Sequence, residues 1–313
     1  MTCKFFKYGH LILFSLITSF VYSQKTQDSI SRENTRNHQI ELRHDNDFFQ
    51  FTDKYYTTGN FISYRWLLQD KKNKTQNSLF LSQEVYTPSL LEETDISKFD
   101  RPYGGYLAIN FEHTITGQDW IFDFIYSFGV TGKISGGEWL QNLFHSTAAT
   151  DSRIASWVGQ IENNFTNNCY FKYLKEWELH TDPFNVYFAV APSTAIGIKE
   201  IYFQNDILFF IGKRNPTLHT AAYHQLGVLK NEFFLGINVG YRYVAHNTML
   251  EGNLIGDNSI FLVDPLHHLL LLSTDIHLRR GRSDIKLSYK FKSAETNTTE
   301  SHLYVSLSLA RNF

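Results

Sequence analysis

The segment 136–145 carries residues that could act together in acid–base chemistry. It has neither the alternation of a strand nor the composition of a turn, so it predicts a short helix within a loop. Gln141 and His145 are four residues apart and would share one face of that helix. A neutral histidine beside a carboxylate can serve as a general base, and Asp151 follows His145 within the same loop. Because the chain has 13 histidines, a structural role for His145 is the alternative interpretation.

A second polar cluster lies between residues 45 and 59. It consists of Asp45-Asn46-Asp47 and of the run Asp53-Lys54-Tyr55-Tyr56-Thr57-Thr58-Gly59. Carboxylate, amide and hydroxyl oxygens placed close together are hard ligands of the kind that Ca²⁺ takes. The alternative is that these residues form the rim of a hairpin, where Asp and Asn side chains commonly bond their own backbone.

The elements that must position these residues are strands. Apolar residues alternate with polar or small residues in four stretches, 62–68, 122–130, 233–243 and 303–309. A period of two gives each strand one apolar and one polar face. Weaker candidates bring the expected number to about twelve, and they lie at 38–50, 77–87, 104–114, 168–180, 184–197, 200–212, 266–279 and 283–293.

Three features favour a transmembrane β-barrel over a soluble β-sandwich, which would also alternate. The strands have the roughly 9–11 residues that a tilted strand needs to cross a bilayer. Aromatic residues, 16 % of the chain, cluster on the apolar faces and at strand ends, as in interfacial girdles. The last strand ends at Phe313, which resembles the terminal signal of bacterial outer-membrane barrels. We therefore predict an all-β fold, a closed antiparallel barrel with one short helix near the site.

Residues 1–23 have the pattern of a cleavable signal peptide. Lys4 and Lys7 precede a short apolar run, which at roughly 11 residues falls below the ~20 that a spanning helix needs. The remaining chain, 24–313, is expected to form one barrel domain. It contains a single cysteine, Cys169, so neither an internal disulfide nor a cysteine-based metal site can form. The net charge of -2 leaves no basic field to attract nucleic acid, which we exclude as a partner.

Four blocks of residues occur in a specific order. They are Asn46-Asp47 with Asp53-x-Tyr55-Tyr56-Thr57-x-Gly59, then Asp100-Arg101-Pro102-Tyr103-Gly104-Gly105-Tyr106, then Gln141-x-x-x-His145, and finally Trp157-x-x-Gln160-Ile161-Glu162-Asn163. Together these blocks resemble the lipid A 3′-O-deacylase (LpxR-like) family of outer-membrane β-barrels. The resemblance covers about residues 38–165, and the second half of the chain matches only as barrel strands.

The resemblance implies a twelve-stranded barrel in the outer membrane of a Gram-negative bacterium. Its active site would lie between the barrel wall and the helix, near the outer-leaflet end. The reaction would be hydrolysis of an ester-linked acyl chain of lipid A, the lipid anchor of lipopolysaccharide, with a divalent cation, Ca²⁺. The partners would be this substrate and the surrounding outer-membrane lipid, and the protein is expected to be a monomer.

By position, the resemblance also assigns roles to single residues. His145 would be the general base that activates water, Asn46, Asp47 and Asp151 would help to hold the cation, and Thr57 and Gln141 would complete the site by hydrogen bonding. Asp151 stands where the family pattern has a Glu, in a loop that is one residue longer.

Two other functions are compatible with a barrel of this kind. One is a non-catalytic barrel that serves as a passive pore or a surface-binding scaffold. The other is an outer-membrane phospholipase, which would release a lyso-phospholipid. The chain has no Gly-x-Ser-x-Gly block, which counts against the usual serine esterase arrangement.

Overall fold

The structure, a computed structural model, describes residues 35–46, 54–147, 154–181, 183 and 185–313. The side chains of His145 and Thr147 are not among the parts that are described. The predicted signal peptide, Asp47 and Asp151 lie outside the described residues.

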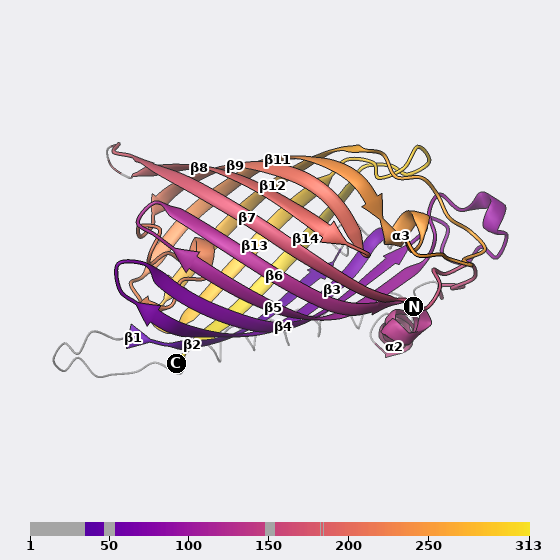
Figure 1. Cartoon of the computed structure of the whole chain (residues 1–313), viewed down its shortest axis with the longest axis horizontal. Coiled ribbons are helices and arrows are strands. Elements are labelled where there is room, and N and C mark those ends of the chain that lie inside the picture. Colours follow the sequence, from indigo (N-terminus) through magenta and orange to yellow (C-terminus); the bar gives the residue numbers. More distant parts are fainter. Residues whose placement is uncertain (1–34, 47–53, 148–153, 182, 184) are drawn as a thin grey trace, which may run out of the picture. The chain divides into compact units, whose positions relative to one another are not determined.

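Twelve antiparallel strands form a closed barrel (Figure 1). They are β2 (His38–Asn46), β3 (Tyr55–Asp70), β4 (Lys74–Thr87), β5 (Gly104–Thr116), β6 (Trp120–Thr131), β7 (Phe165–Leu179), β8 (Val186–Gly197), β9 (Glu200–Lys213), β11 (Glu232–Asn247), β12 (His268–Arg280), β13 (Ser283–Lys292) and β14 (His302–Asn312). Each strand pairs with the next barrel strand along the chain, and β14 pairs with β2 to close the circle. The predicted fold and strand number are therefore confirmed.

The period-two pattern places apolar side chains on the outside of the barrel. On β2, Ile40 and Leu42 are 45 % and 53 % exposed, whereas Gln39 and Glu41 are buried in the interior. A closed sheet satisfies every backbone group by strand pairing, which is the condition for a sheet to lie in lipid. The outer surface is therefore suited to hydrocarbon and the lumen to water.

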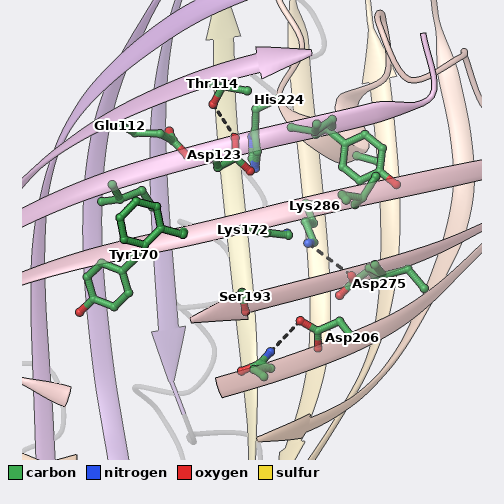
Figure 2. A pocket seen from close by; sticks show the side chains of 18 of the residues that line it. Glu112, Thr114, Asp123, Tyr170, Lys172, Ser193, Asp206, His224, Asp275 and Lys286 are labelled. Carbon is green, nitrogen blue, oxygen red and sulfur yellow. Dashed lines mark hydrogen bonds and ion pairs between the residues drawn. The ribbon is translucent and has the colours of Figure 1, made fainter. Parts of the chain in front are cut away.

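The lumen is lined by charged and polar side chains (Figure 2). One cavity inside it has a volume of about 440 Å³. Lys286 of β13 forms an ion pair with Asp275 of the neighbouring strand β12 at 3.3 Å, and Thr114 donates a hydrogen bond to Asp123 at 2.7 Å. These charges are buried from lipid but compensated by one another, as the interior of a polar barrel requires.

The two ends of the barrel differ in their connections. At the end where Phe313 donates a backbone hydrogen bond to His38, the hairpin turns 71–73, 117–119 and 281–282 are short. At the opposite end four connections are long, namely 88–103, 132–164, 248–267 and 293–301, and one, 198–199, is short. We call these the terminal end and the loop end. Short turns at one end and longer loops at the other are typical of outer-membrane barrels.

One long segment, 214–231, lies at the terminal end and reaches into the barrel. It contains the 3₁₀ helix η4 (Ala221–Tyr223) and the short strand β10 (Gly227–Val228), which pairs with β1 (Thr35–Arg36). His224 of this segment lines the lumen cavity together with residues of the barrel wall (Figure 2). We call residues 214–231 the plug segment.

Buried cations of the wall hold the plug segment through its backbone carbonyls. Lys74 Nζ donates to the carbonyl oxygens of Leu218 and Leu226, the latter at 2.6 Å. Arg279 donates to the carbonyl oxygen of His219 at 2.8 Å. Both cations are fully buried, so these hydrogen bonds satisfy groups that water cannot reach.

The described helices of the loop end are short. They are η2 (Ile96–Lys98), η3 (Lys133–Ser135), α2 (Gly137–Thr147) and α3 (Thr248–Glu251), and Figure 1 shows α2 and α3 at the end away from the C-terminus. The helix predicted at 136–145 corresponds to α2. Within the described part of the chain, no helix has the length and hydropathy needed to cross a membrane.

Candidate functional site

Helix α2 packs against the outside of the barrel wall, over β4 and β5. Gly105 of β5 is an even number of residues away from Ile109 and Phe111, whose side chains face outward. It therefore faces out of the barrel as well. A Cβ atom at Gly105 would collide with Ser135 Oγ and would lie 3.3 Å from the backbone nitrogen of Gly137. The absence of a side chain at this position therefore lets the start of α2 approach the wall closely.

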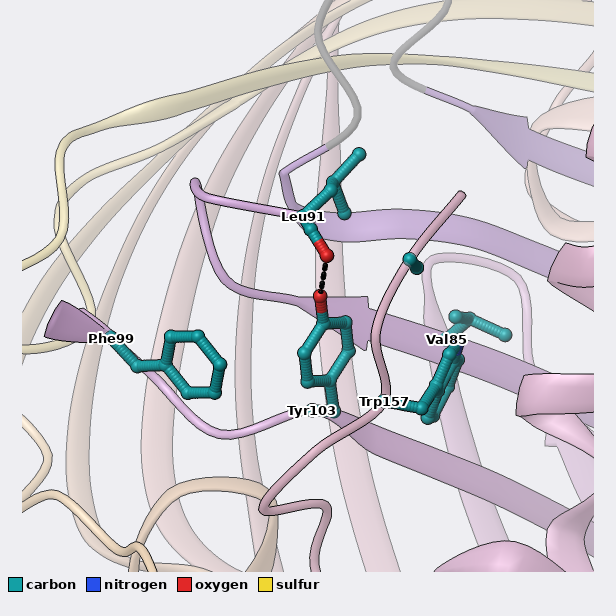
Figure 3. Packing of buried hydrophobic residues seen from close by; sticks show 6 residues of the cluster. Val85, Leu91, Phe99, Tyr103 and Trp157 are labelled. Carbon is teal, nitrogen blue, oxygen red and sulfur yellow. Dashed lines mark hydrogen bonds between the residues drawn. The ribbon is translucent and has the colours of Figure 1, made fainter. Parts of the chain in front are cut away.

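Gln141 lies on the buried side of α2, with 4 % of its surface exposed. Trp157 Nε1 donates a hydrogen bond to Gln141 Oε1 at 2.8 Å. The Trp157 ring stacks on the ring of Tyr103 at a centroid distance of 5.1 Å, and both belong to an apolar cluster with Val85 of β4 (Figure 3). The cluster thereby fixes the orientation of the Gln141 amide.

The backbone at Trp157 is held in the left-handed region, with φ of 53°. A bulky residue rarely adopts this conformation, because it costs about 1 kcal/mol or more. The packing of the indole in the apolar cluster and its bond to Gln141 stabilise the strained conformation. Strain of this kind concentrates at functional sites.

The segment 155–163, which we call the strap segment, holds α2 and η3 against the barrel. Gln160 Nε2 donates to Glu138 Oε2 of α2 at 3.1 Å. Asn163 Oδ1 accepts a hydrogen bond from the backbone N–H of Ile134 at 3.0 Å. The last block of the family resemblance therefore positions the helix that carries Gln141 and His145.

The block around Arg101 and Tyr103 supports the same region from the loop side. Tyr103 OH donates to the carbonyl oxygen of Leu91 at 2.5 Å (Figure 3). The fully buried Arg101 donates to Glu295 at 3.0 Å. Burial by itself would raise the pKa of Glu295, but Lys292 and Arg101 outweigh this effect and lower the pKa to about 2. This block supplies structural support for the site.

Asn46 and Thr57 lie at the loop end of β2 and β3. Asn46 Nδ2 donates to the carbonyl oxygen of Thr57 at 3.4 Å. A β-bulge shifts the register of β3 between Tyr56 and Thr58, next to Tyr55, which has a φ of 66°. Bulges of this kind re-aim a side chain next to active sites.

The bulge directs Thr57 and Tyr56 to different environments. Tyr56 lines the lumen and donates to Asp45 Oδ2 at 3.0 Å. Thr57 is buried, and its Oγ1 lies 2.7 Å from the Oγ1 of Thr87. Tyr86 lines the lumen, so the next residue of β4, Thr87, faces the other way. Thr57 therefore meets Thr87 on the outer side of the wall.

Strand β4 connects the two halves of the site. Thr87 contacts Thr57, and Val85, two residues earlier on the same face, packs against Trp157. Trp157 in turn bonds to Gln141. The structure thus links Thr57 and Gln141 along the outer side of β4, and Asn46 joins them through its bond to the Thr57 carbonyl.

The other predicted site residues are placed only in part. The backbone of His145 lies in α2, one turn after Gln141, which puts both residues on the same face of the helix. Asp47 and Asp151 fall outside the described residues. In the described ranges, no group of three or more His, Cys, Asp or Glu residues is arranged to hold a metal ion.

Sequence reasoning assigned no role to Thr87 or Gly105. Thr87 becomes a neighbour of Thr57 through the pairing of β3 with β4, and a single threonine at a strand end carries no signal of this contact. Gly105 stood within a recognised block, where a glycine pair in a strand can indicate a close backbone approach. That signal could have located the docking point of α2.

Comparisons with known proteins agree with this architecture. The structure is similar to that of LpxR from Salmonella typhimurium, with a TM-score of 0.75 and 17 % sequence identity, over 88 % of this chain and 100 % of that chain. The β domain of the Bordetella autotransporter BrkA gives a TM-score of 0.46 at 7 % identity, over 89 % of this chain and 99 % of that chain. At such identities, the similarity to LpxR shows a shared fold.

The sequence itself was compared with curated proteins and with family models. No curated protein matches it. The model of the family described as outer membrane protein LpxR matches residues 11–313, nearly the whole chain. This match, together with the barrel and its external helix, shows that the chain belongs to the LpxR family of outer-membrane proteins.

Proposed function

We propose that this protein hydrolyses the ester-linked 3′-O acyl chain of lipid A in the outer membrane. The observation that supports the proposal is that Asn46, Thr57 and Gln141 are linked on the outer side of the wall, by the bond of Asn46 to the Thr57 carbonyl and by the contacts of Thr57 and Gln141 along β4. A lipid substrate leaves its leaflet only at a cost of roughly 0.8 kcal/mol for each CH₂ that enters water. A site on the outer wall allows the reaction to occur while the acyl chains stay in the leaflet.

In the proposed reaction His145 acts as the general base. This role is assigned to His145 because it follows Gln141 by four residues, and residues at that spacing share one face of a helix. A neutral imidazole would take the proton of the attacking water, and hydrogen bonds from Gln141 and Thr57 would orient the reacting groups. The mechanism needs no serine nucleophile, in agreement with the absence of a Gly-x-Ser-x-Gly block from the sequence.

The proposed cation ligands are Asn46, Asp47 and Asp151. They offer an amide oxygen and two carboxylates, a set of hard donors that fits Ca²⁺. When bound, this ion would polarise the ester carbonyl and stabilise the oxyanion. The bond of Asn46 to the Thr57 carbonyl supports this assignment, because it links Asn46 to the rest of the site.

The test is hydrolysis of lipid A by the refolded full chain in the presence of Ca²⁺. Mass spectrometry is expected to show the loss of one acyl unit from the 3′ position, whereas a lyso-phospholipid from added phospholipid would indicate the phospholipase instead. A chelator or the substitution His145→Ala is expected to abolish the product, and activity should fall as the pH drops through the titration of His145.

A matched control is His113→Ala. His113 also lies on the outer side of the wall, where its Nδ1 is 2.7 Å from Asn77 Oδ1, but it is near the terminal end of β5. Its removal should leave the activity unchanged. Lipid A that stays intact while the barrel is folded, as judged by its heat-modifiable migration on a gel, would contradict the proposal.

A further inference from the structure

Three polar side chains stand next to one another on the outer wall below the candidate site. They are His44 of β2, Asn60 of β3 and Gln83 of β4, which we call the polar row. His44 is the register partner of Asn60, and Asn60 is the register partner of Gln83. Each belongs to the outward parity of its strand, so the row faces the lipid.

The polar row interrupts a line of apolar residues that continues through the same register on both sides. Beyond Gln83 the line continues with Leu107, Val130 and Phe165, and beyond His44 with Leu307, Leu287 and Ile276. Phe165 is the first residue of β7 and 67 % exposed, so even the position at the loop end is apolar. Depth in the membrane therefore does not explain why this stretch is polar.

The polar row adjoins the residues of the candidate site. His44 precedes Asn46 by two residues on the same face, which is a separation of roughly 6.7 Å along a strand, and Asn60 follows Thr57 by three residues on β3. Gln83 Nε2 donates to the carbonyl oxygen of Ser135 at 3.0 Å, at the base of α2. An acyl chain that enters the site along the wall would pass over this row.

The hydrogen bonds of the row leave both a donor and an acceptor available. His44 Nδ1 lies 2.8 Å from Asn60 Oδ1, and the Gln83 amide nitrogen is used by Ser135. Within the described part of the chain, no hydrogen bond uses Asn60 Nδ2 or Gln83 Oε1. A hydroxyl group both donates and accepts, so it can bond to both atoms, whereas an ester oxygen or a methylene cannot.

We infer that the polar row binds the hydroxyl on the third carbon of a 3-hydroxyacyl chain while its ester lies in the site. This inference rests on the proposed function and names the feature of the acyl chain that the enzyme selects. The hydroxyl is separated from the ester carbon by a few bonds, and the row lies two residues from Asn46 on β2 and three residues from Thr57 on β3. Inside the hydrocarbon region the row has no water to bond to, and the hydroxyl would supply the missing hydrogen-bond partner.

The experiment compares two lipid A substrates that differ only in the 3′-O chain, one 3-hydroxyacyl and one unsubstituted. The readout is the ratio of the two kcat/KM values for the refolded full chain in mixed micelles with Ca²⁺. The wild type is expected to prefer the hydroxylated chain by about tenfold, the effect of one or two neutral hydrogen bonds. Asn60→Leu is expected to reduce the ratio to near one while hydrolysis of the unsubstituted chain continues.

Two further variants make the result specific. Asn77 also faces outward and also pairs with a histidine, His113. The control variant Asn77→Leu is therefore expected to leave the ratio unchanged. His44→Leu removes the partner of Asn60 Oδ1 and is expected to lower the ratio as Asn60→Leu does. A leucine at a lipid-facing position suits the membrane, so these variants should fold.

The possible failures are distinguishable. If the wild type hydrolyses neither substrate, the proposed function itself is wrong. If it hydrolyses both at the same kcat/KM, or if Asn60→Leu keeps the wild-type ratio, the assignment of the polar row is overturned while the deacylase function stands.

Discussion

At the scale of the residue, the site depends on side chains that orient other side chains. Trp157 donates a hydrogen bond to Gln141 Oε1 and so fixes the orientation of this amide on α2. Trp157 is in turn held by stacking on Tyr103, whose hydroxyl is bonded to the Leu91 carbonyl. The polar atoms of the site are therefore positioned by an aromatic cluster that takes no part in the proposed reaction.

We predict that Trp157→Phe lowers kcat/KM for lipid A by up to about tenfold, because it removes one hydrogen bond worth roughly 0.5–1.5 kcal/mol. The phenyl ring keeps most of the stacking on Tyr103. Trp139→Phe is the matched control, because Trp139 lies on the same helix but is 66 % exposed. Equal activities of the two variants would show that the Trp157–Gln141 bond does not matter for the reaction.

Glu295 gives a second prediction, on stability against pH. Its pKa of about 2 lies below the value of about 4.3 in an unfolded chain, because Lys292 and Arg101 outweigh the effect of burial. The carboxylate thus stabilises the folded state above about pH 4.3, and this contribution, on the order of 3 kcal/mol, is lost as the pH falls towards 2.

The measurement for Glu295 is urea unfolding of the refolded barrel at several pH values between 7 and 2. The Glu295→Gln variant lacks the titrating group, so the difference in unfolding free energy between it and the wild type should shrink as the pH falls. A difference that stays constant over this range would rule out the ion pair with Arg101 as its source.

At the scale of the element, the site exists because α2 can lie directly on the wall. Gly105 removes the side chain that would separate them, and the strap segment, residues 155–163, holds the helix from the other side. The helix is short, and isolated helices of this length are marginal in water. Its position therefore depends on tertiary contacts.

We predict that Gly105→Ala lowers the activity by roughly tenfold to a hundredfold, because it displaces α2 and with it Gln141 and His145. Gly104→Ala provides the control, since the Cβ at this position would meet side-chain ends and no backbone, namely Met249 Cε at 2.6 Å and Ile161 Cδ1 at 3.2 Å. Both variants should still fold into a barrel. Loss of activity in both, or in neither, would argue against Gly105 as the docking point of α2.

At the scale of the whole molecule, the barrel is apolar outside, polar inside and closed at its terminal end. The plug segment, residues 214–231, is tied to the wall by Lys74 and Arg279 and borders the lumen cavity. A segment in this position would obstruct the lumen, which predicts a low conductance. This arrangement favours an enzyme of the outer wall over the passive pore.

We predict that the wild type shows little conductance in a planar bilayer, and that replacing residues 216–229 with a short turn raises the conductance severalfold. Shortening the loop at 254–260, at the other end of the barrel, should leave the conductance at the wild-type level because the plug segment remains. A wild-type conductance like that of an open porin would contradict the closed lumen and favour the pore.

Local patterns in the sequence determined the elements of this protein. Alternation in 122–130 and 233–243 was sufficient to predict strands, and its loss in 136–145 was sufficient to predict a helix. The same alternation determined which face is apolar, since side chains on a strand point to opposite sides in turn. These properties depend only on neighbours along the chain.

Only the tertiary structure decided which residues meet. The contact of Thr57 with Thr87, the docking of α2 on Gly105 and the row formed by His44, Asn60 and Gln83 all depend on strand register. Register in a closed barrel is set jointly by all twelve pairings, and one of them joins the last strand to the first. A shift by a single residue would turn each of these side chains to the opposite face, so local patterns predict the strands but cannot predict the site that they assemble.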